Sequence, residues 1–437
     1  MRDFALPERL SVLRNPGFRR LLAGRSVSVL GDGLYSVAAM WLVFELTGSS
    51  AYTGIAGFLT GIPGLFSVLV GPIVDRSELD RVLTLSEVAQ GVVVLVVPLA
   101  WLTGNLTVWV VLVTMPILSA VGLFANPAQT AAVPRLVPSE SLVRANAAAS
   151  SVRQAVSALA RGVGGALIAV VGAVGVYLID AVTFVVAALT FASLSVPGPR
   201  TDGGEEDGNS EEFDDNEDDV DGDADASFDL ESYLTELREG VAIVTGSILG
   251  RMVLAVLFAN FTSSAAFAVL PAFSEELGGA GMYGLILAGF TVGNVVGSLF
   301  SSTVESIPLG RTTIVGMSTA GILFAAGIWV ASPVVTLALV TVSRVPVGMY
   351  NVSVIATLQS GVPDDKLGRV SSAISSGSNL VSPLGLLVGG FLGDIIGAWT
   401  VLLASGAGSV IMAMYWLVVP SLRNFEPPTN VEPGSFG

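Results

Sequence analysis

The chain has 437 residues, of which 52% are hydrophobic and only 13% are charged. Soluble domains carry roughly 25% charged residues, so this composition excludes a water-soluble globule. Cysteine and histidine are absent, which excludes disulfides, thiolate nucleophiles, zinc sites and histidine acid/base chemistry. We therefore expect proton handling to fall to carboxylates, and we expect no catalytic residue, no metal ion and no cofactor.

Twelve segments are long and apolar enough to cross a bilayer, because about 30 Å of hydrocarbon requires roughly 20 helical residues. They lie near residues 20–45, 52–74, 80–102, 106–131, 147–171, 175–196, 248–272, 282–303, 311–331, 334–358, 370–393 and 398–420. The first follows several arginines and no small-residue cleavage site follows it, so we expect a retained helix rather than a signal peptide. The predicted fold class is an all-α integral membrane protein with two six-helix bundles.

An acidic segment separates the two groups of six spans. The net charge of −16 is local to it, since residues 202–239 hold 18 acidic side chains and a single basic one, Arg238. We divide the chain into a first bundle at 1–197, an acidic linker at 198–246, a second bundle at 247–423 and a tail at 424–437. Apolar residues at near-helical spacing within 229–245 predict an amphipathic helix before the seventh span. The acidic run, with only one lysine in the chain, Lys366, is typical of halophilic proteins and equally of a solvated linker.

Arginines set the expected orientation. Connectors after the even-numbered spans contain Lys or Arg, whereas those after spans 1, 3, 5, 7, 9 and 11 contain none. By the positive-inside rule, both termini and the acidic linker are predicted to be cytoplasmic. The expected location is the cytoplasmic membrane, with many passes.

The two halves repeat each other in sequence. A shift of 225 residues places Val137, Pro138, Leu142, Arg144, Ser150, Ser151, Leu159, Gly164, Gly165 and Gly172 on Val362, Pro363, Leu367, Arg369, Ser375, Ser376, Leu384, Gly389, Gly390 and Gly397. A shift of 230 places Gly54, Asp75, Leu79 and Arg81 on Gly284, Glu305, Leu309 and Arg311. Parallel repeats of this kind are typical of transporters in which two bundles rock about a site at the membrane midplane.

Several motifs carry a family resemblance. They are Asn15-Pro16-Gly17-Phe18-Arg19, Gly31-Asp32, Gly71 with Asp75-Arg76, Val137-Pro138 with Leu142 and Arg144-Ala145-Asn146, Gln359, Val362-Pro363 and Gly368-Arg369-Val370. Their order and spacing resemble the major facilitator superfamily along essentially the whole chain, and within it the drug/proton antiporters that include macrolide and siderophore exporters. Two departures stand out: Ser77-Glu78-Leu79-Asp80 intervene before Arg81, and Ala160-Arg161 replace a usual Gly-Pro pair.

Ionisable side chains inside the membrane are costly, at roughly 2.5–3.5 kcal/mol each, so each needs a partner or a water-filled cavity. The candidates for substrate binding or ion coupling near the midplane are Asp32, Arg161, Arg344, Asn260, Asn294 and Asn379, with Arg25 and Asp180 added closer to the two surfaces. Arg25 and Asp32 share a helix face but lie about 10 Å apart, which is too far for a direct pair. The resemblance implies that Asp32 faces Arg161 across the first bundle as an exchangeable ion pair; the alternative is a fixed structural pair.

Three further expectations concern residues nearer the surfaces. Asp180 is expected near the outer face as a capping or gating residue, and Glu87 near the cytoplasmic surface with a structural role. A cytoplasmic gate is expected from the loop residues Gly71, Asp75, Arg76, Arg81, Glu305, Arg311, Arg144 and Arg369. Carboxylates there are stabilised by helix N-termini of the other bundle when the cytoplasmic side is closed.

The function that best fits is secondary active transport of a small amphiphilic or hydrophobic molecule, with efflux coupled to protons or sodium ions as the resemblance implies. The sequence has no nucleotide-binding loop of the Gly-x-x-x-x-Gly-Lys type. Uptake, or transport of a lipid or anionic siderophore, stays open because Arg161 and Arg344 can attract an anion. An intramembrane enzyme is disfavoured, since Lys366 lies in a loop and deep carboxylates are few. The expected partners are the cargo, a coupling ion and the bilayer, with no nucleic acid, for a monomer.

Overall fold

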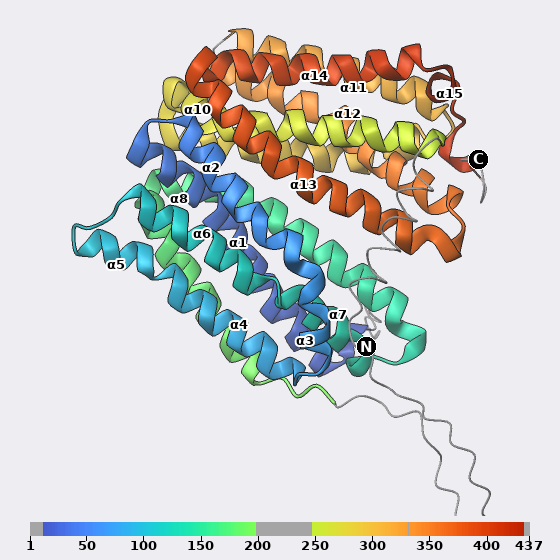
Figure 1. Cartoon of the computed structure of the whole chain (residues 1–437). Helices are drawn as coiled ribbons and strands as arrows, with labels where there is room; N and C mark the ends of the chain where they lie inside the picture. The colour runs from blue at the N-terminus through green and yellow to red at the C-terminus, as the bar shows by residue number, and fades with distance from the viewer. Residues whose placement is uncertain (1–11, 198–246, 331, 432–437) are drawn as a thin grey trace, which may run out of the picture.

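The computed structural model describes residues 12–197, 247–330 and 332–431, which form α-helices and short 3-10 segments joined by brief loops. The acidic linker and the amphipathic helix expected at 229–245 lie outside the described residues. Figure 1 shows the two halves of the chain as separate helical bundles, with the N-terminal half in blue to green and the C-terminal half in yellow to red. The predicted all-α membrane architecture is thus confirmed.

The N-terminal bundle begins with the long helix α1, which the Asn15 side chain caps and Pro16 starts. Its elements are α1 (Pro16–Thr47), α2 (Ser50–Gly61), η2 (Ile62–Leu69), α3 (Gly71–Asp75), α4 (Leu79–Val94), α5 (Val96–Leu102), α6 (Val108–Gly122), α7 (Ala125–Leu136), η3 (Ser139–Ser141) and α8 (Leu142–Ala192).

The C-terminal bundle follows the same plan. Its elements are α10 (Ile248–Leu299), η4 (Ser301–Thr303), α11 (Leu309–Val330), α12 (Pro333–Gly361), α13 (Asp364–Ile396), α14 (Ala398–Val418), α15 (Pro420–Arg423) and η5 (Pro428–Asn430).

Nine helical segments among the described residues are long and apolar enough to cross a membrane. Two of them reverse direction: α8 at Gly172, and α10 at Gly278 and Gly279, where the backbone leaves the helical region. Each therefore supplies two crossings. The remaining crossing is α2 with η2, where Pro63 interrupts the α-helical hydrogen bonding soon after Gly61. These segments correspond to the twelve predicted spans.

The backbone repeats between the halves as the sequence predicts. Gly172, where α8 turns back, has φ 75° and ψ 165°, and its counterpart Gly397 between α13 and α14 has φ 87° and ψ 145°. Both positions need a conformation that glycine adopts without strain. Val137 and Val362 likewise both end a helix in extended conformation. The sequence repeat is therefore a structural repeat.

The halves touch through glycines that the repeat relates. A Cβ on Gly165 of α8 would overlap the backbone of Gly284 in α10, and one on Gly54 of α2 would lie 3.0 Å from Cα of Gly390 in α13. Gly165 corresponds to Gly390, and Gly54 corresponds to Gly284. The two contacts are thus copies of each other, and both bring backbones together as small residues do between membrane helices.

These contacts join only one end of the two bundles. Along α2 and α13 they run from Ser50 and Asp394 to Gly61, at the end of α2, and Pro383, near the middle of α13. From there the helices of the two halves diverge toward the end where α1 begins and α14 ends, at the right of Figure 1. We call this the terminal end and the opposite one the far end. The structure is closed at the far end and separated at the terminal end.

Residues after α15 pack onto the C-terminal bundle. The backbone N–H groups of Leu309 and Gly310 donate to the carbonyls of Glu426 and Phe425, at 3.2 and 3.4 Å. These are N–H groups in the first turn of α11, which have no partner within the helix. Phe425 and Val431 are buried beside α10 and α12 residues. This segment therefore caps α11 at the terminal end.

Candidate functional site

A polar cavity of about 340 Å³ opens between α1, α7 and the first part of α8, in the terminal half of the N-terminal bundle. Its polar lining residues are Arg25, Ser26, Gln129, Thr130, Asn146, Ser150 and Arg153. The Arg25 guanidinium donates to Oδ1 of Asn126 at 2.8 Å, while its Nε and the Nε2 of Gln129 are buried and have no acceptor in the described part of the chain. The cavity therefore presents hydrogen-bond donors that a ligand with acceptor groups can satisfy.

Three carboxyl groups lie deeper in the same bundle, on three different spans. They are Asp32 of α1, Glu87 of α4 and Asp180 of α8, and the charge of Asp32 acts on both of the others. Glu87 and Asp180 are completely buried; the Ser28 side chain interacts with Glu87, whereas the Asp180 Oδ2 has no hydrogen-bond partner among the described residues. A buried anion without a donor is costly, so this cluster suits groups that exchange protons.

Asp180 is held against the backbone of α1. Its Oδ1 accepts from the Thr183 hydroxyl at 3.1 Å, and a Cβ on Gly31 would collide with both side chains. The expectation of an outer-face capping residue is thus wrong for Asp180, because Gly31 leaves room for it in the bundle core. Glu87 likewise lies beside Asp32 rather than at the cytoplasmic surface, where its sequence position had placed it.

Two tyrosines border the carboxyl cluster and were not predicted as site residues. The rings of Tyr35 and Tyr177 meet edge to face with centroids 5.3 Å apart, and neither buried hydroxyl has a hydrogen-bond partner within the ranges that the structure describes. Tyr35 interacts electrostatically with Asp32 and Asp180. The three-residue spacing of Tyr177 and Asp180, which places both on one face of the sixth span, was the available signal, but Tyr177 resembles an ordinary aromatic residue of an apolar face.

Arg161 does not meet Asp32 in this conformation. Ala160 packs on Gly33, and Gly162 packs on Ala288 of the other half, so these two faces of α8 are occupied. Arg161 lies between them by the helical repeat and opposite the exposed Leu159 face, and its side chain is exposed. The cation that acts on Asp32 is instead Arg25, and no ion pair within 4 Å joins Asp32 to either arginine among the described residues.

In the C-terminal half, Arg344 of α12 is held by aromatic rings. Its Cζ lies 4.0 Å from the ring centre of Phe290 and 5.2 Å from that of Phe324. Such cation–π contacts stabilise a desolvated guanidinium by about 2 kcal/mol. No carboxylate in the described part of the chain pairs with Arg344, and its Nε is buried without an acceptor. Arg344 is therefore a cation that can pair with an anionic or hydrogen-bond-accepting group of a ligand.

The three candidate asparagines differ in their surroundings. Asn294 donates to the carbonyl of Phe290 at 2.9 Å and leaves its Oδ1 buried without a donor. Asn260 donates to the Ser378 hydroxyl at 3.2 Å and so joins α10 to α13. Asn379 is exposed. Asn294 therefore belongs with Arg344 and Phe290, whereas Asn260 has a partner between helices.

A carboxylate at the far end joins the two halves, and the sequence analysis did not select it. Asp394, at the end of α13, accepts from the backbone N–H of Ser50 at 2.7 Å and from the Ser49 hydroxyl. Ser49 is the N-cap of α2, so the charge of Asp394 sits at a helix N-terminus. The Thr53 hydroxyl also donates to the carbonyl of Ala268 across the same interface.

The predicted gate residues lie at the terminal end, where the halves are apart. Arg76, Arg144, Glu305, Arg311 and Arg369 are exposed there. A Cβ on Gly71 would meet open space, and the side chain of Asp75 lies outside the described part of the structure.

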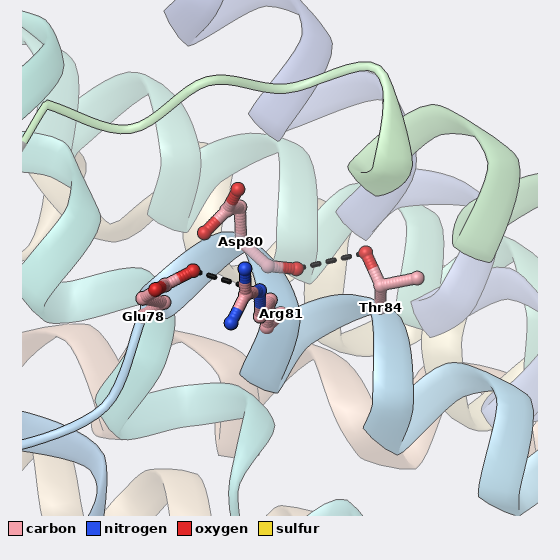
Figure 2. A network of polar contacts seen from close by, with 4 residues as sticks. All are labelled: Glu78, Asp80, Arg81 and Thr84. Carbon is pink, nitrogen blue, oxygen red and sulfur yellow. Dashed lines mark hydrogen bonds and ion pairs between the residues drawn. The ribbon is translucent and has the colours of Figure 1, made fainter.

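The loop that begins α4 forms its own local network. Figure 2 shows Arg81 paired with Glu78 at 2.7 Å, one turn apart, and Thr84 donating to the carbonyl of Asp80 at 2.8 Å. Arg81 and Glu78 are both exposed. The inserted Glu78 thus holds Arg81 within its own bundle in this conformation.

No group of three or more acidic side chains among the described residues is arranged to hold a metal ion. The polar features of the described residues are instead hydrogen-bond donors that line a cavity, buried carboxyl groups, and Arg344, which has no carboxylate partner among those residues.

Comparison with known proteins places these features in a family. The family model "Major Facilitator Superfamily" matches residues 21–251 and 252–435. The macrolide efflux protein A of Streptococcus pyogenes is 23% identical over 422 residues, which cover 94% of this chain and 97% of that protein. The multidrug efflux pump Tap of Mycobacterium bovis is 32% identical over 193 residues, which cover 42% and 45% of the two chains.

Among solved structures, a bacterial homologue of the human lysosomal transporter Spinster, in an inward-facing and unoccupied conformation, matches with a TM-score of 0.67. It shares 14% identity, and the match covers 96% of this chain and 98% of that one. This likeness shows the fold. With the family match over both bundles, the conclusion follows that this chain is a membrane transporter and belongs to the Major Facilitator Superfamily.

Proposed function

We propose that this transporter exports a small amphiphilic molecule across the cytoplasmic membrane by alternating access, with proton entry as the driving force. The observation that carries the proposal is the adjacency of a donor-lined cavity to a buried carboxyl cluster in the N-terminal bundle. Relatives named as macrolide and multidrug efflux proteins support export of such molecules.

Arg25 is the residue that links the donor-lined cavity to the carboxyl cluster. It lines the cavity, and Asp32 and Glu87 both act on its charge. Cargo that binds Arg25 removes part of the positive potential that favours the ionised form of Asp32. Protonation of Asp32 in turn removes a negative charge that acts on Arg25, so proton binding and cargo binding are coupled through one cation. This scheme replaces the exchange between Asp32 and Arg161 that the sequence suggested.

Access alternates when the contacts at the far end break and the separated ends close. The Gly165–Gly284 and Gly54–Gly390 contacts and the Asp394 hydrogen bonds hold the far end shut. We take the far end as extracellular because the arginine-rich connectors lie at the other end. Closing the terminal end then brings the gate residues other than Arg311 together.

Arg344 favours a second candidate cargo, an amphiphile with an anionic group. The arginine, the unpaired Asn294 Oδ1 and the rings of Phe290 and Phe324 combine a cation with apolar surface. A carboxylate on the cargo supplies the counterion that the described residues lack. Lipid-like and siderophore-like cargo belong to this class, and uptake of either stays open within the same mechanism.

The proposal is tested with purified protein in sealed vesicles and a panel of amphiphilic cations, neutral compounds and anions. Transport of at least one compound that depends on a pH gradient, and that stops when the gradient is collapsed, supports proton-coupled export. Transport that follows a sodium gradient at constant pH assigns sodium as the coupling ion instead. Equal transport with no gradient of either ion contradicts secondary active transport and leaves facilitated diffusion.

A further inference from the structure

A second cavity, of about 360 Å³, is lined only by residues of the C-terminal bundle. Its walls come from α11, α12 and the loop that follows η4. Helix α11 packs against α12, α14 and α15, all within the same half. The lining of this cavity includes neither Arg344 nor any residue that lines the cavity of the N-terminal bundle.

The mouth of this cavity is apolar, with a cation at one end. Arg311, Val315 and Thr319 follow one another by one turn each along α11, and all three are exposed. Val315 is 66% exposed and Ile307 is 40% exposed, as expected for side chains that face lipid tails. The stripe runs about 12 Å from Arg311, near the start of α11, toward the middle of the membrane.

Two buried hydroxyls line the cavity without partners. Thr313 Oγ1 and the Tyr350 hydroxyl find no hydrogen-bond partner in the described residues, although Thr313 is 1% exposed and Tyr350 is 9% exposed. Buried hydroxyls are normally satisfied. Both can donate to ester or phosphate oxygens of a molecule that enters from the membrane.

We propose that this groove binds an anionic phospholipid of the leaflet at the terminal end. Its phosphate pairs with Arg311, one acyl chain follows the stripe past Val315, and Thr313 and Tyr350 hydrogen-bond its polar backbone. Anionic lipids are enriched in the cytoplasmic leaflet, which is the expected position of Arg311. Occupancy of the groove at the terminal end of α11 therefore depends on how much anionic lipid the bilayer contains.

Native mass spectrometry of the full-length protein tests the proposal after extraction from vesicles of phosphatidylcholine with or without phosphatidylglycerol. Three variants are compared with the wild type. Arg311→Gln removes the headgroup partner. Gly316→Leu fills the groove, because a Cβ there lies 3.4 Å from Cβ of Pro346 with no closer neighbour. Lys366→Gln is the matched control, since it removes an exposed cation at the same end outside the cavity.

We expect the wild type and Lys366→Gln to retain phosphatidylglycerol in preference to phosphatidylcholine by about fivefold, the contribution of one arginine at a membrane surface. Arg311→Gln should lose that preference, and Gly316→Leu should retain neither lipid. An unchanged preference in Arg311→Gln, or lipid retained by Gly316→Leu, overturns the proposal. Displacement of the bound lipid by inorganic phosphate also overturns it, because the groove is then a site for free anions.

Discussion

Replacing Asp394 by alanine should shift this transporter toward the conformation that is open at the far end. The substitution removes the acceptor for the Ser50 N–H, at 2.7 Å, and for the Ser49 hydroxyl. A hydrogen bond to an ionised group contributes about 1.5–3 kcal/mol. Because Asp394 is partly exposed to solvent, the lower figure applies, and a loss of about 1.5 kcal/mol changes the ratio of the two conformations roughly tenfold.

The natural absence of cysteine makes the assay direct. Cysteines at Asn105 and Val334, which are exposed near the far end of the two halves, carry spin labels for double electron–electron resonance. The population with the longer label separation should rise about tenfold in Asp394→Ala. Asp394→Asn, which keeps an acceptor oxygen but loses the charge, should give an intermediate shift.

Glu276→Gln is the matched control, since Glu276 is an exposed carboxylate near the same end of α10. It should leave the distance distribution unchanged. Equal distributions in the wild type and Asp394→Ala would show that the carboxylate contributes nothing to closure, and the reasoning on its two hydrogen bonds would fail. An equal shift in Glu276→Gln would assign the effect to general surface charge.

Three other substitutions test separate parts of the mechanism. Asp32→Asn should abolish accumulation of cargo against its gradient while cargo binding persists; accumulation at the wild-type level in vesicles would exclude coupling through Asp32. Gly165→Leu forces a side chain into the backbone of Gly284, at a cost of about 1–3 kcal/mol, so the far-end label pair should report roughly tenfold more open molecules; a wild-type distribution would contradict the contact. Arg344→Gln should raise the KM of anionic cargo about tenfold or more and leave that of neutral cargo unchanged, and equal changes for both would make Arg344 structural.

The sequence predicted the parts of the fold that depend on hydrophobic length and on repetition. Hydropathy marked the twelve crossings, and the 225-residue shift paired Gly172 with Gly397, which share one backbone conformation. The helices extend past the apolar windows, as α1 does from Pro16 to Thr47, because their polar ends continue into the interfacial region. The same shifts paired the glycines at which the halves meet, although glycine matches alone looked weak.

The site was harder to predict because it depends on how each helix is rotated about its axis. Ala160 fits against Gly33, and this contact turns Arg161 away from Asp32. Gly31 has no side chain and so leaves space for Asp180 in the core of the bundle. A hydropathy window does not detect such a space. The role of Asp394 requires the N-terminus of α2 from the other half, which is far away in the sequence. These are tertiary contacts between residues far apart in the chain.

The central claim is that the two bundles move as units, so that one end closes as the other opens. Two label pairs in the cysteine-free protein test it together: Asn105 with Val334 at the far end, and Ser139 with Thr303, both exposed, at the terminal end. Both label pairs are measured across a pH series with and without cargo. We expect the far-end separation to lengthen in every condition in which the terminal-end separation shortens. The fraction of molecules open at the far end should equal the fraction closed at the terminal end. Ends that change independently, or one end that never changes, would contradict it.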